Sequence, residues 1–152
     1  RIIMRVLGLI VLCTGLMVGI GSNLDVMHDT PSAVIVLVGT LGLLLLGGNR
    51  LGNMFRAVFS AEAAVADLLD AAQAWKQAAA YLLACGGIGT FIGLIIMLMH
   101  IDDPAAVAPA MAISLLPTFY GILLGLGISL PLSTRLEDRA QQQGEEMPSR
   151  VV

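Results

Sequence analysis

Charged residues are scarce in this sequence. They make up 12% of its 152 residues, against about 25% in ordinary globular domains, whereas 57% of the residues are hydrophobic and the mean hydropathy is +0.89. A soluble helical bundle would leave uncharged runs such as Gly86–Met99 facing water. Lipid is therefore the expected solvent for much of the surface, and the sequence predicts an all-α membrane protein.

Long apolar segments are what the sequence has in place of charge. A membrane-spanning helix needs about 20 mainly apolar residues. Four segments meet or approach this length, which predicts four transmembrane helices at about 2–20, 33–48, 78–99 and 111–132. A secretory signal peptide is the alternative for the first segment. Thr30-Pro31 and Asp103-Pro104 predict helix starts before the second and fourth spans, with a capping residue followed by proline.

Lysine and arginine are missing from two of the connecting loops. Residues 21–30 and 100–107 contain neither, but they hold four of the eleven acidic residues. All eight basic residues fall on the other side of the predicted membrane: Arg1, Arg5, Arg50, Arg56, Lys76, Arg135, Arg139 and Arg150. The positive-inside rule therefore predicts that both termini and the segment 49–77 are cytoplasmic.

The segment 49–77 repeats its apolar residues at intervals of three and four. The stripe consists of Val58, Ala61, Val65, Leu68, Ala72, Trp75, Ala79 and Leu82. This pattern predicts a helix that continues from the third span into the cytoplasm and packs against a neighbour. Glu62, Asp67 and Asp70 lie mainly off the stripe, where they form either a solvated face or a contact with a rotor or effector. Residues 138–152 read as a polar cytoplasmic tail.

Catalytic and metal-binding patterns are also lacking. His28 and His100 have no ligands at metal spacing, and no nucleophile has a base placed beside it. His100, next to Asp102 and Asp103, is either an interfacial residue or a pH sensor. The two cysteines, Cys13 and Cys85, lie in apolar runs and are interpreted as packing residues. The sequence predicts neither an enzyme nor a bound cofactor, and no basic cluster suits nucleic acid.

Carboxylates are absent from all four predicted spans, although ion-translocating proteins usually carry one at mid-depth. If an ion crosses, another polypeptide must bring the acid. The third and fourth spans instead carry small and polar stripes, made of Gly86, Thr90, Gly93 and Met97, and of Ser114, Thr118, Gly121 and Gly125. Close helix packing explains such stripes as well as an ion path does. Pro117 releases the carbonyl of Ile113, which suits a cation or a bound water.

These residues carry a resemblance. The stretches Gly87–Leu94, Asp102–Pro104 and Pro109–Gly121, with Leu130–Leu132, resemble the signature of MotA-type stator subunits in the MotA/TolQ/ExbB family. The front hairpin, with Asp25 and Pro31-Ser32 leading into Ile35-Val36-Leu37-Val38-Gly39-Thr40, is similar as well. The resemblance covers residues 1–137, which we interpret as one four-span membrane domain.

The resemblance implies a pentameric ring of this chain in the bacterial inner membrane. The ring would surround two copies of a single-span partner of the MotB or ExbD kind, which supplies the membrane aspartate. Proton or sodium flow through the complex would drive mechanical work. We expect Thr90, Thr118, Ser114 and Pro117 on the ion pathway, and the glycines at packing positions around the pore: Gly86, Gly93, Gly121 and Gly125.

Two features depart from the family pattern. Only residues 49–77 stand where flagellar MotA has a large cytoplasmic domain, and Pro117 stands where the family usually has Thr or Ala. Two alternatives therefore stay open beside the motor subunit. One is an energy transducer of the ExbB or TolQ kind, and the other is a four-span scaffold that conducts nothing.

Overall fold

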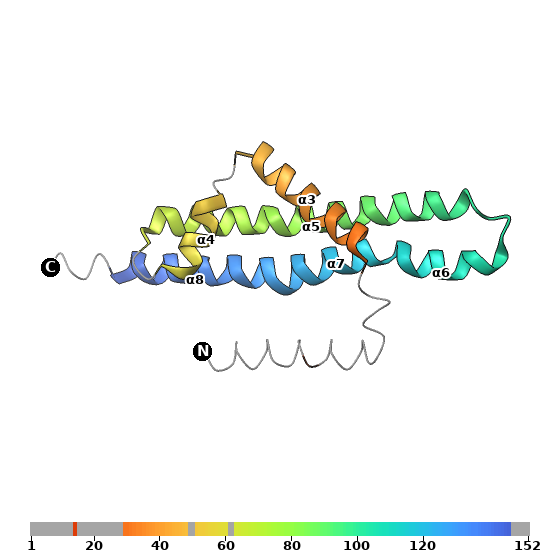
Figure 1. Ribbon diagram of the computed structural model, residues 1–152. Coiled ribbons are helices and arrows are strands. Elements are labelled where there is room, and N and C mark those ends of the chain that lie inside the picture. Colours follow the sequence, from red (N-terminus) through yellow and green to blue (C-terminus); the bar gives the residue numbers. More distant parts are fainter. Residues whose placement is uncertain (1–13, 15–28, 49–50, 61–62, 147–152) are drawn as a thin grey trace. The chain divides into compact units, whose positions relative to one another are not determined.

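The computed structural model describes residues 14, 29–48, 51–60 and 63–146 (Figure 1). All regular elements within these residues are helical, which confirms the predicted all-α class. The chain divides into two compact units, 1–30 and 31–152. The predicted first span, 2–20, lies outside the described residues except for Thr14, and so does most of the loop that follows it.

Helices α3 (Thr30–Leu46) and α4 (Leu51–Phe59) come first. Helix α3 begins at the predicted Thr30-Pro31 signal. Every fourth residue of α3 is buried, which gives a narrow face made of Ser32, Val36, Thr40 and Leu44. Leu44, at the end of this face, clusters with Met54 of α4 and with Ala74 and Ala78 of helix α5 (Val65–Leu98). Taken together, α3 and α4 are apolar enough for one broken span, bent by 103° at the break.

Helix α5 is continuous over 34 residues. At 1.5 Å per residue it is about 50 Å long, well beyond the roughly 30 Å of a bilayer's hydrocarbon core. The predicted continuity from the third span into the preceding segment is therefore present. The prediction was wrong at its start, however, because Val58 belongs to α4, and the two helices are separate between Phe59 and Val65.

The rest of the described chain forms one long helical rod beside α5 (Figure 1). It consists of α6 (Pro104–Ser114), α7 (Leu116–Leu124), the π-helix η1 (Gly125–Ser129) and α8 (Leu130–Glu146). The predicted start at Asp103-Pro104 is confirmed, and the Asp103 carboxylate accepts a bond from the Ala105 backbone N–H at 3.1 Å. Besides Pro104 at its start, the rod contains Pro109 inside α6, Pro117 at the start of α7 and Pro131 at the start of α8.

Two irregularities in the rod lie next to prolines. The chain turns at Leu115 between α6 and α7, two residues before Pro117, which has no N–H to continue the helical bonding. In η1, the N–H of Leu130 donates to the carbonyl of Gly125, five residues back. Pro131 follows directly and offers no N–H to the carbonyl of Gly127. The wider π turn thus lies where the regular helical bond to the Gly127 carbonyl is missing.

A buried apolar core lies where α4, α5 and α8 meet. Its buried members are Ala57, Leu68, Ala71, Ala72, Leu136 and Ala140. The small alanine side chains allow the three helices to approach closely. The guanidinium of Arg139 donates to the carbonyls of Ala57 at 3.1 Å and Ser60 at 2.6 Å, at the C-terminal end of α4. Arg139 thereby satisfies carbonyls that a helix end leaves without a partner.

Two helical segments are long and apolar enough to cross a membrane, namely Val65–Leu98 and Pro104–Glu145. The pair α3 and α4 raises the number to three within the described residues if it counts as one span. Large apolar side chains stand exposed on both long segments, including Phe91 and Ile95 on α5 and Ile113 and Leu126 on the rod. Such surfaces suit lipid or neighbouring subunits rather than water.

Candidate functional site

Glycines bring α5 and the rod into backbone contact. A Cβ added at Gly121 would lie 2.5 Å from the carbonyl oxygen of Leu82, and one at Gly86 would lie 2.7 Å from that of Pro117. Gly93 is similarly confined, since an added Cβ would lie 2.7 Å from Cβ of Ser114, and Gly125 is less so, at 3.0 Å from the Ala79 carbonyl oxygen. A side chain at Gly86, Gly93 or Gly121 would force atoms of the facing helix to shift. The stripes identified in the sequence therefore face each other.

Thr90 and Thr118 meet inside this contact. Their hydroxyl oxygens are 2.7 Å apart, and both side chains are half-buried. The Thr118 hydroxyl also lies 3.3 Å from the backbone carbonyl oxygen of Gly86, to which it donates. The three groups form a short polar chain within an otherwise apolar helix contact. Residues 28 positions apart in the sequence thus supply adjacent oxygens in the contact between α5 and α7.

Ser114 and Pro117 lie in the same contact but play different structural parts. The Ser114 side chain is 3% exposed, and its hydroxyl donates to the carbonyl of Met111 at 2.8 Å, one turn back on its own helix. Pro117 is buried and packs near the position of Gly89, where an added Cβ would lie 2.7 Å from Cβ of the proline. The structure therefore brings all eight residues singled out in the sequence to one helix contact.

A further polar group lies on the α3 side of α5. The Thr40 hydroxyl is buried, with 6% of the residue exposed, and its oxygen has no hydrogen-bond partner among the described residues. Thr40 was named from the sequence only as part of the front hairpin, without a predicted role. Its position on a four-residue repeat with Val36 and Leu44 was the available signal that it faces another helix.

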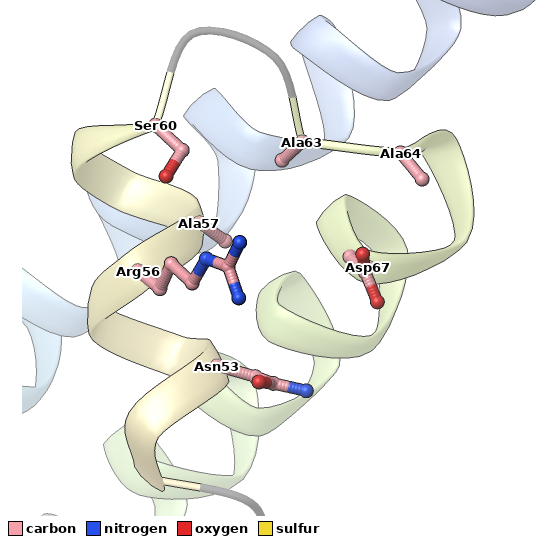
Figure 2. A pocket seen from close by; sticks show the side chains of 7 residues that line it. All are labelled: Asn53, Arg56, Ala57, Ser60, Ala63, Ala64 and Asp67. Carbon is pink, nitrogen blue, oxygen red and sulfur yellow. The ribbon is translucent and has the colours of Figure 1, made fainter.

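An open cavity of about 560 Å³ lies between α4 and the beginning of α5 (Figure 2). Its polar lining consists of Asn53, Arg56 and Ser60 from α4 and the residue after it, and of Asp67 from the first turn of α5. Figure 2 shows Arg56 and Asp67 on opposite walls of this cavity. A second cavity of about 540 Å³ shares Asn53 and Asp67 and extends to Asp70 and Gln77.

Only part of this charged region was expected from the sequence. Asp67 and Asp70 are exposed, as a position off the apolar stripe predicts, while Glu62 lies outside the described residues. Asn53 and Arg56 were not singled out. Their facing positions depend on the break between α4 and α5, which periodicity alone did not reveal. His100 is exposed, with Nδ1 3.0 Å from the Ile96 carbonyl oxygen, and no acid, cysteine or histidine cluster that could hold a metal occurs among the described residues.

Comparison with known proteins gives a family match over most of the described chain. Residues 51–149 match the model described as "MotA/TolQ/ExbB proton channel family". The matched region includes α4, α5 and the whole rod, with the Thr90 and Thr118 contact. Helix α3 precedes the match.

Curated relatives align over parts of this chain. Chemotaxis protein PomA of Vibrio alginolyticus is 45% identical over 60 residues, which cover 40% of this chain and 24% of the relative. Motility protein A of Aquifex aeolicus is 32% identical over 118 residues, or 68% of this chain and 46% of the relative. Motility protein A of Cereibacter sphaeroides is 46% identical over 54 residues, or 36% and 21%. The alignments thus span less than half of each relative's length.

Proposed function

Since this chain belongs to the MotA/TolQ/ExbB proton channel family, we propose that it is the pore-forming subunit of an ion-driven motor. The family is one of membrane channels, and the chain is not an enzyme, in agreement with the sequence prediction. In the proposed complex, proton or sodium flow across the bacterial inner membrane drives mechanical work. The similarity to two motility proteins and a chemotaxis protein supports a motor subunit over other family roles.

The polar chain of Thr90, Thr118 and Gly86 is the observation that carries this proposal. A cation that leaves water for hydrocarbon loses hydration that only charge and well-placed oxygens replace. The Thr90 and Thr118 oxygens are 2.7 Å apart in the contact between the two long segments. Ser114 and Pro117, on the same contact, complete the proposed ion pathway, and Gly86, Gly93, Gly121 and Gly125 hold its walls together.

The missing carboxylate defines the partner. None of the 11 acidic residues lies in a predicted span, and a conducting pathway needs one. We therefore assign the acid to a single-span partner subunit of the MotB or ExbD kind, two copies of which stand in the centre of a ring of five copies of this chain. The exposed apolar side chains of α5 and the rod suit both lipid and the neighbouring copies in such a ring.

Flux measurement on the assembled complex tests the proposal. The chain is co-expressed with its single-span partner, and native mass spectrometry establishes the numbers of both subunits before reconstitution in liposomes. The double variant Thr90→Val, Thr118→Val keeps the shape of both side chains and removes both hydroxyls. We expect the variant complex to retain its composition while proton or sodium flux falls by about tenfold or more, because ligand contacts to a charge are stronger than neutral hydrogen bonds.

The two alternatives predict different results. A scaffold whose threonines serve only in packing would assemble and show no flux with either the parent or the double variant. An energy transducer of the ExbB or TolQ kind would conduct and respond like the motor subunit, but it would associate with an envelope protein instead of a rotor. The short region between α3 and the membrane part of α5 favours an effector other than a flagellar rotor. Normal flux through a well-assembled double variant would refute the proposed pathway.

A further inference from the structure

Large apolar side chains are exposed in the segment that precedes the predicted third span. Within the described residues of 51–77 they are Phe55 and Phe59 on α4 and Leu69 on α5, which are 55%, 85% and 47% exposed. Exposed phenylalanine is unfavourable in water, and clustered apolar side chains usually mark a surface that another molecule covers.

Lipid does not reach these side chains. Leu69 comes nine residues before Ala78, where the third span is expected to begin, so it lies about 14 Å outside the hydrocarbon core at 1.5 Å per residue. Ala57 of α4 shares a buried core with Leu68 of α5. Phe59 follows Ala57 by two residues and therefore lies at about the height of Leu69. The cover must come from protein.

The exposed side chains of α4 and α5 point in opposite directions. An α-helix turns by about 100° per residue, so Leu69 stands about 180° from Ala78 and about 140° from Ala74 around the axis of α5. Both alanines belong to one buried cluster with Met54 of α4. Phe59 stands about 140° from Met54 around the axis of α4. Phe59 thus faces away from α5, and Leu69 faces away from α4.

We propose that α4 packs on α5 of the next copy of this chain, with Phe55 and Phe59 of one copy against Leu69 of its neighbour. The inference rests on the proposed function, since it concerns the ring of five copies. In a closed ring, two different surfaces on opposite sides of each subunit meet head to tail. The face of α4 and the Leu69 side of α5 meet this requirement, because both are apolar, lie at one height and point in opposite directions.

The Leu69 side of α5 continues into the membrane. Leu98 lies about 20° and Phe91 about 40° from Leu69 around the helix axis, and both are exposed. A neighbouring copy that contacts Phe91 within the bilayer therefore also meets Leu69 outside it. Lipid could cover Phe91 and Leu98 alone, but only a protein surface covers all three.

Opposite charges flank the two surfaces. Arg56 is exposed on α4, one turn before Phe59, whereas Asp70 is exposed directly after Leu69. The positive edge of one copy thus faces the negative edge of the next. Charges at such exposed positions are screened by salt, so they orient the contact more than they stabilise it.

The contact would connect neighbouring copies through α4. Within one copy, Arg139 of α8 donates to the carbonyls of Ala57 and Ser60 at the end of α4. With Phe59 seated on the next copy, the extension of the fourth span in one subunit is joined to the extension of the third span in its neighbour. Helix α4 then acts as a clamp between subunits outside the membrane.

Disulfide crosslinking between copies tests this contact. Chains with Phe59→Cys and chains with Leu69→Cys, which carry different tags and have Cys13 and Cys85 replaced by alanine, are co-expressed with the single-span partner. Native mass spectrometry gives the number of copies before oxidation. Asp67→Cys in place of Leu69→Cys is the matched control, because Asp67 lies two residues away but about 160° around the helix.

We expect at least about tenfold more disulfide between differently tagged chains with Leu69→Cys than with Asp67→Cys, because the bond requires Cβ atoms about 3.5–4.5 Å apart. Equal yields, or no disulfide in an intact ring of five, would overturn the contact and leave the proposed ring standing. The face of α4 would then be available to a cytoplasmic effector. A parent complex without five copies would refute the ring itself.

A double-mutant cycle decides the question if a cysteine variant does not assemble. Phe59→Ala, Leu69→Ala and the double variant are compared by the temperature at which the ring dissociates, followed by size-exclusion chromatography. Substitutions of residues in contact are not additive. We expect the double variant to dissociate at the temperature of the weaker single variant. Fully additive losses, or three unchanged temperatures, would overturn the contact.

Discussion

At the scale of single residues, the site depends on glycines without side chains as much as on the two threonine hydroxyls. Gly121 and Gly86 allow two helix backbones to come within contact distance, and the threonine pair is formed only at that separation. A hydrogen bond between helices is worth about 0.6 kcal/mol on average in a membrane. Close packing therefore provides most of the stability of the helix contact. The hydrogen bond between the hydroxyls mainly fixes the relative position of the two side chains.

Gly121→Ala should separate α5 from α7. The new Cβ would lie 2.5 Å from the backbone carbonyl oxygen of Leu82, which cannot move without its helix. Overpacking of this kind costs about 1–3 kcal/mol, more than the roughly 0.5–1 kcal/mol that alanine contributes over glycine to helix stability. We expect a lower melting temperature in detergent, measured by circular dichroism. Gly87→Ala is the matched control, because a Cβ at Gly87 meets nothing within 4 Å, and equal melting temperatures for the two variants would contradict the prediction.

At the scale of elements, α4 is attached to the extension of the fourth span. Arg139 of α8 donates to the last carbonyls of α4, and the buried alanines of both helices share one core. Helix α8 also continues the rod that carries Thr118. A movement of the rod would therefore be transmitted directly to α4 and to the walls of the cavity at Arg56 and Asp67. The ion pair of Lys76 on α5 and Glu137 on α8 joins the two long helices instead, and because both side chains are partly exposed it contributes little stability.

Arg139→Ala should loosen α4 without disturbing the contact of the long helices. Hydrogen bonds from a charged donor contribute about 1.5–3 kcal/mol when buried, and less at a half-exposed site. We expect amide hydrogen exchange in residues 51–59 to become about tenfold faster, whereas exchange around Thr90 and Thr118 stays unchanged. Arg135→Ala is the control, since Arg135 is exposed one turn earlier on α8. Unchanged protection of α4 in the Arg139 variant would show that the core alone holds this helix.

Local signals in the sequence located several elements correctly. The Thr30-Pro31 and Asp103-Pro104 pairs mark the starts of α3 and α6, because capping and proline effects act within one turn. The break between α4 and α5 was missed. Residues 60–64 contain neither proline nor glycine, so the apolar period continues through them, and the end of α4 is instead satisfied by Arg139, 79 residues away. Tertiary contacts of this kind leave no local pattern.

The sequence predicted which helix faces carry the candidate site, but not how the atoms of the two faces are arranged. Four-residue spacing placed Thr90 on one stripe and Thr118 on another, and the two stripes do meet. The 2.7 Å approach of the two hydroxyls and the 3.3 Å contact of Thr118 with the Gly86 carbonyl depend on the relative height of the two helices. A shift of one residue along either helix would separate the hydroxyls without changing the periodicity. Only the structure therefore shows that the two hydroxyls are in contact.

At the scale of the whole molecule, charge is divided between the two ends of the long helices. The connection between α5 and α6 carries Asp102 and Asp103 and no basic residue, whereas Lys76, Arg135 and Arg139 lie toward the opposite end of the helices. In a membrane of bacterial type, basic residues are retained on the cytoplasmic side. The connection should therefore face the outside, with the cavity between α4 and α5 in the cytoplasm.

Cysteine labelling of intact cells would establish this orientation. Ala105 and Gln73 are both exposed and lie at opposite ends of the long helices, so each can accept a single cysteine in a background where Cys13 and Cys85 are replaced by alanine. Ala105→Cys should react with a membrane-impermeant maleimide from outside, after the outer membrane is made permeable. Gln73→Cys should react only once the inner membrane is opened, because it lies on the side with the basic residues. The reverse labelling pattern would place the cavity between α4 and α5 on the outer side of the inner membrane. No cytoplasmic effector could then reach the cavity, and the contact of α4 with the rod would have to serve another purpose.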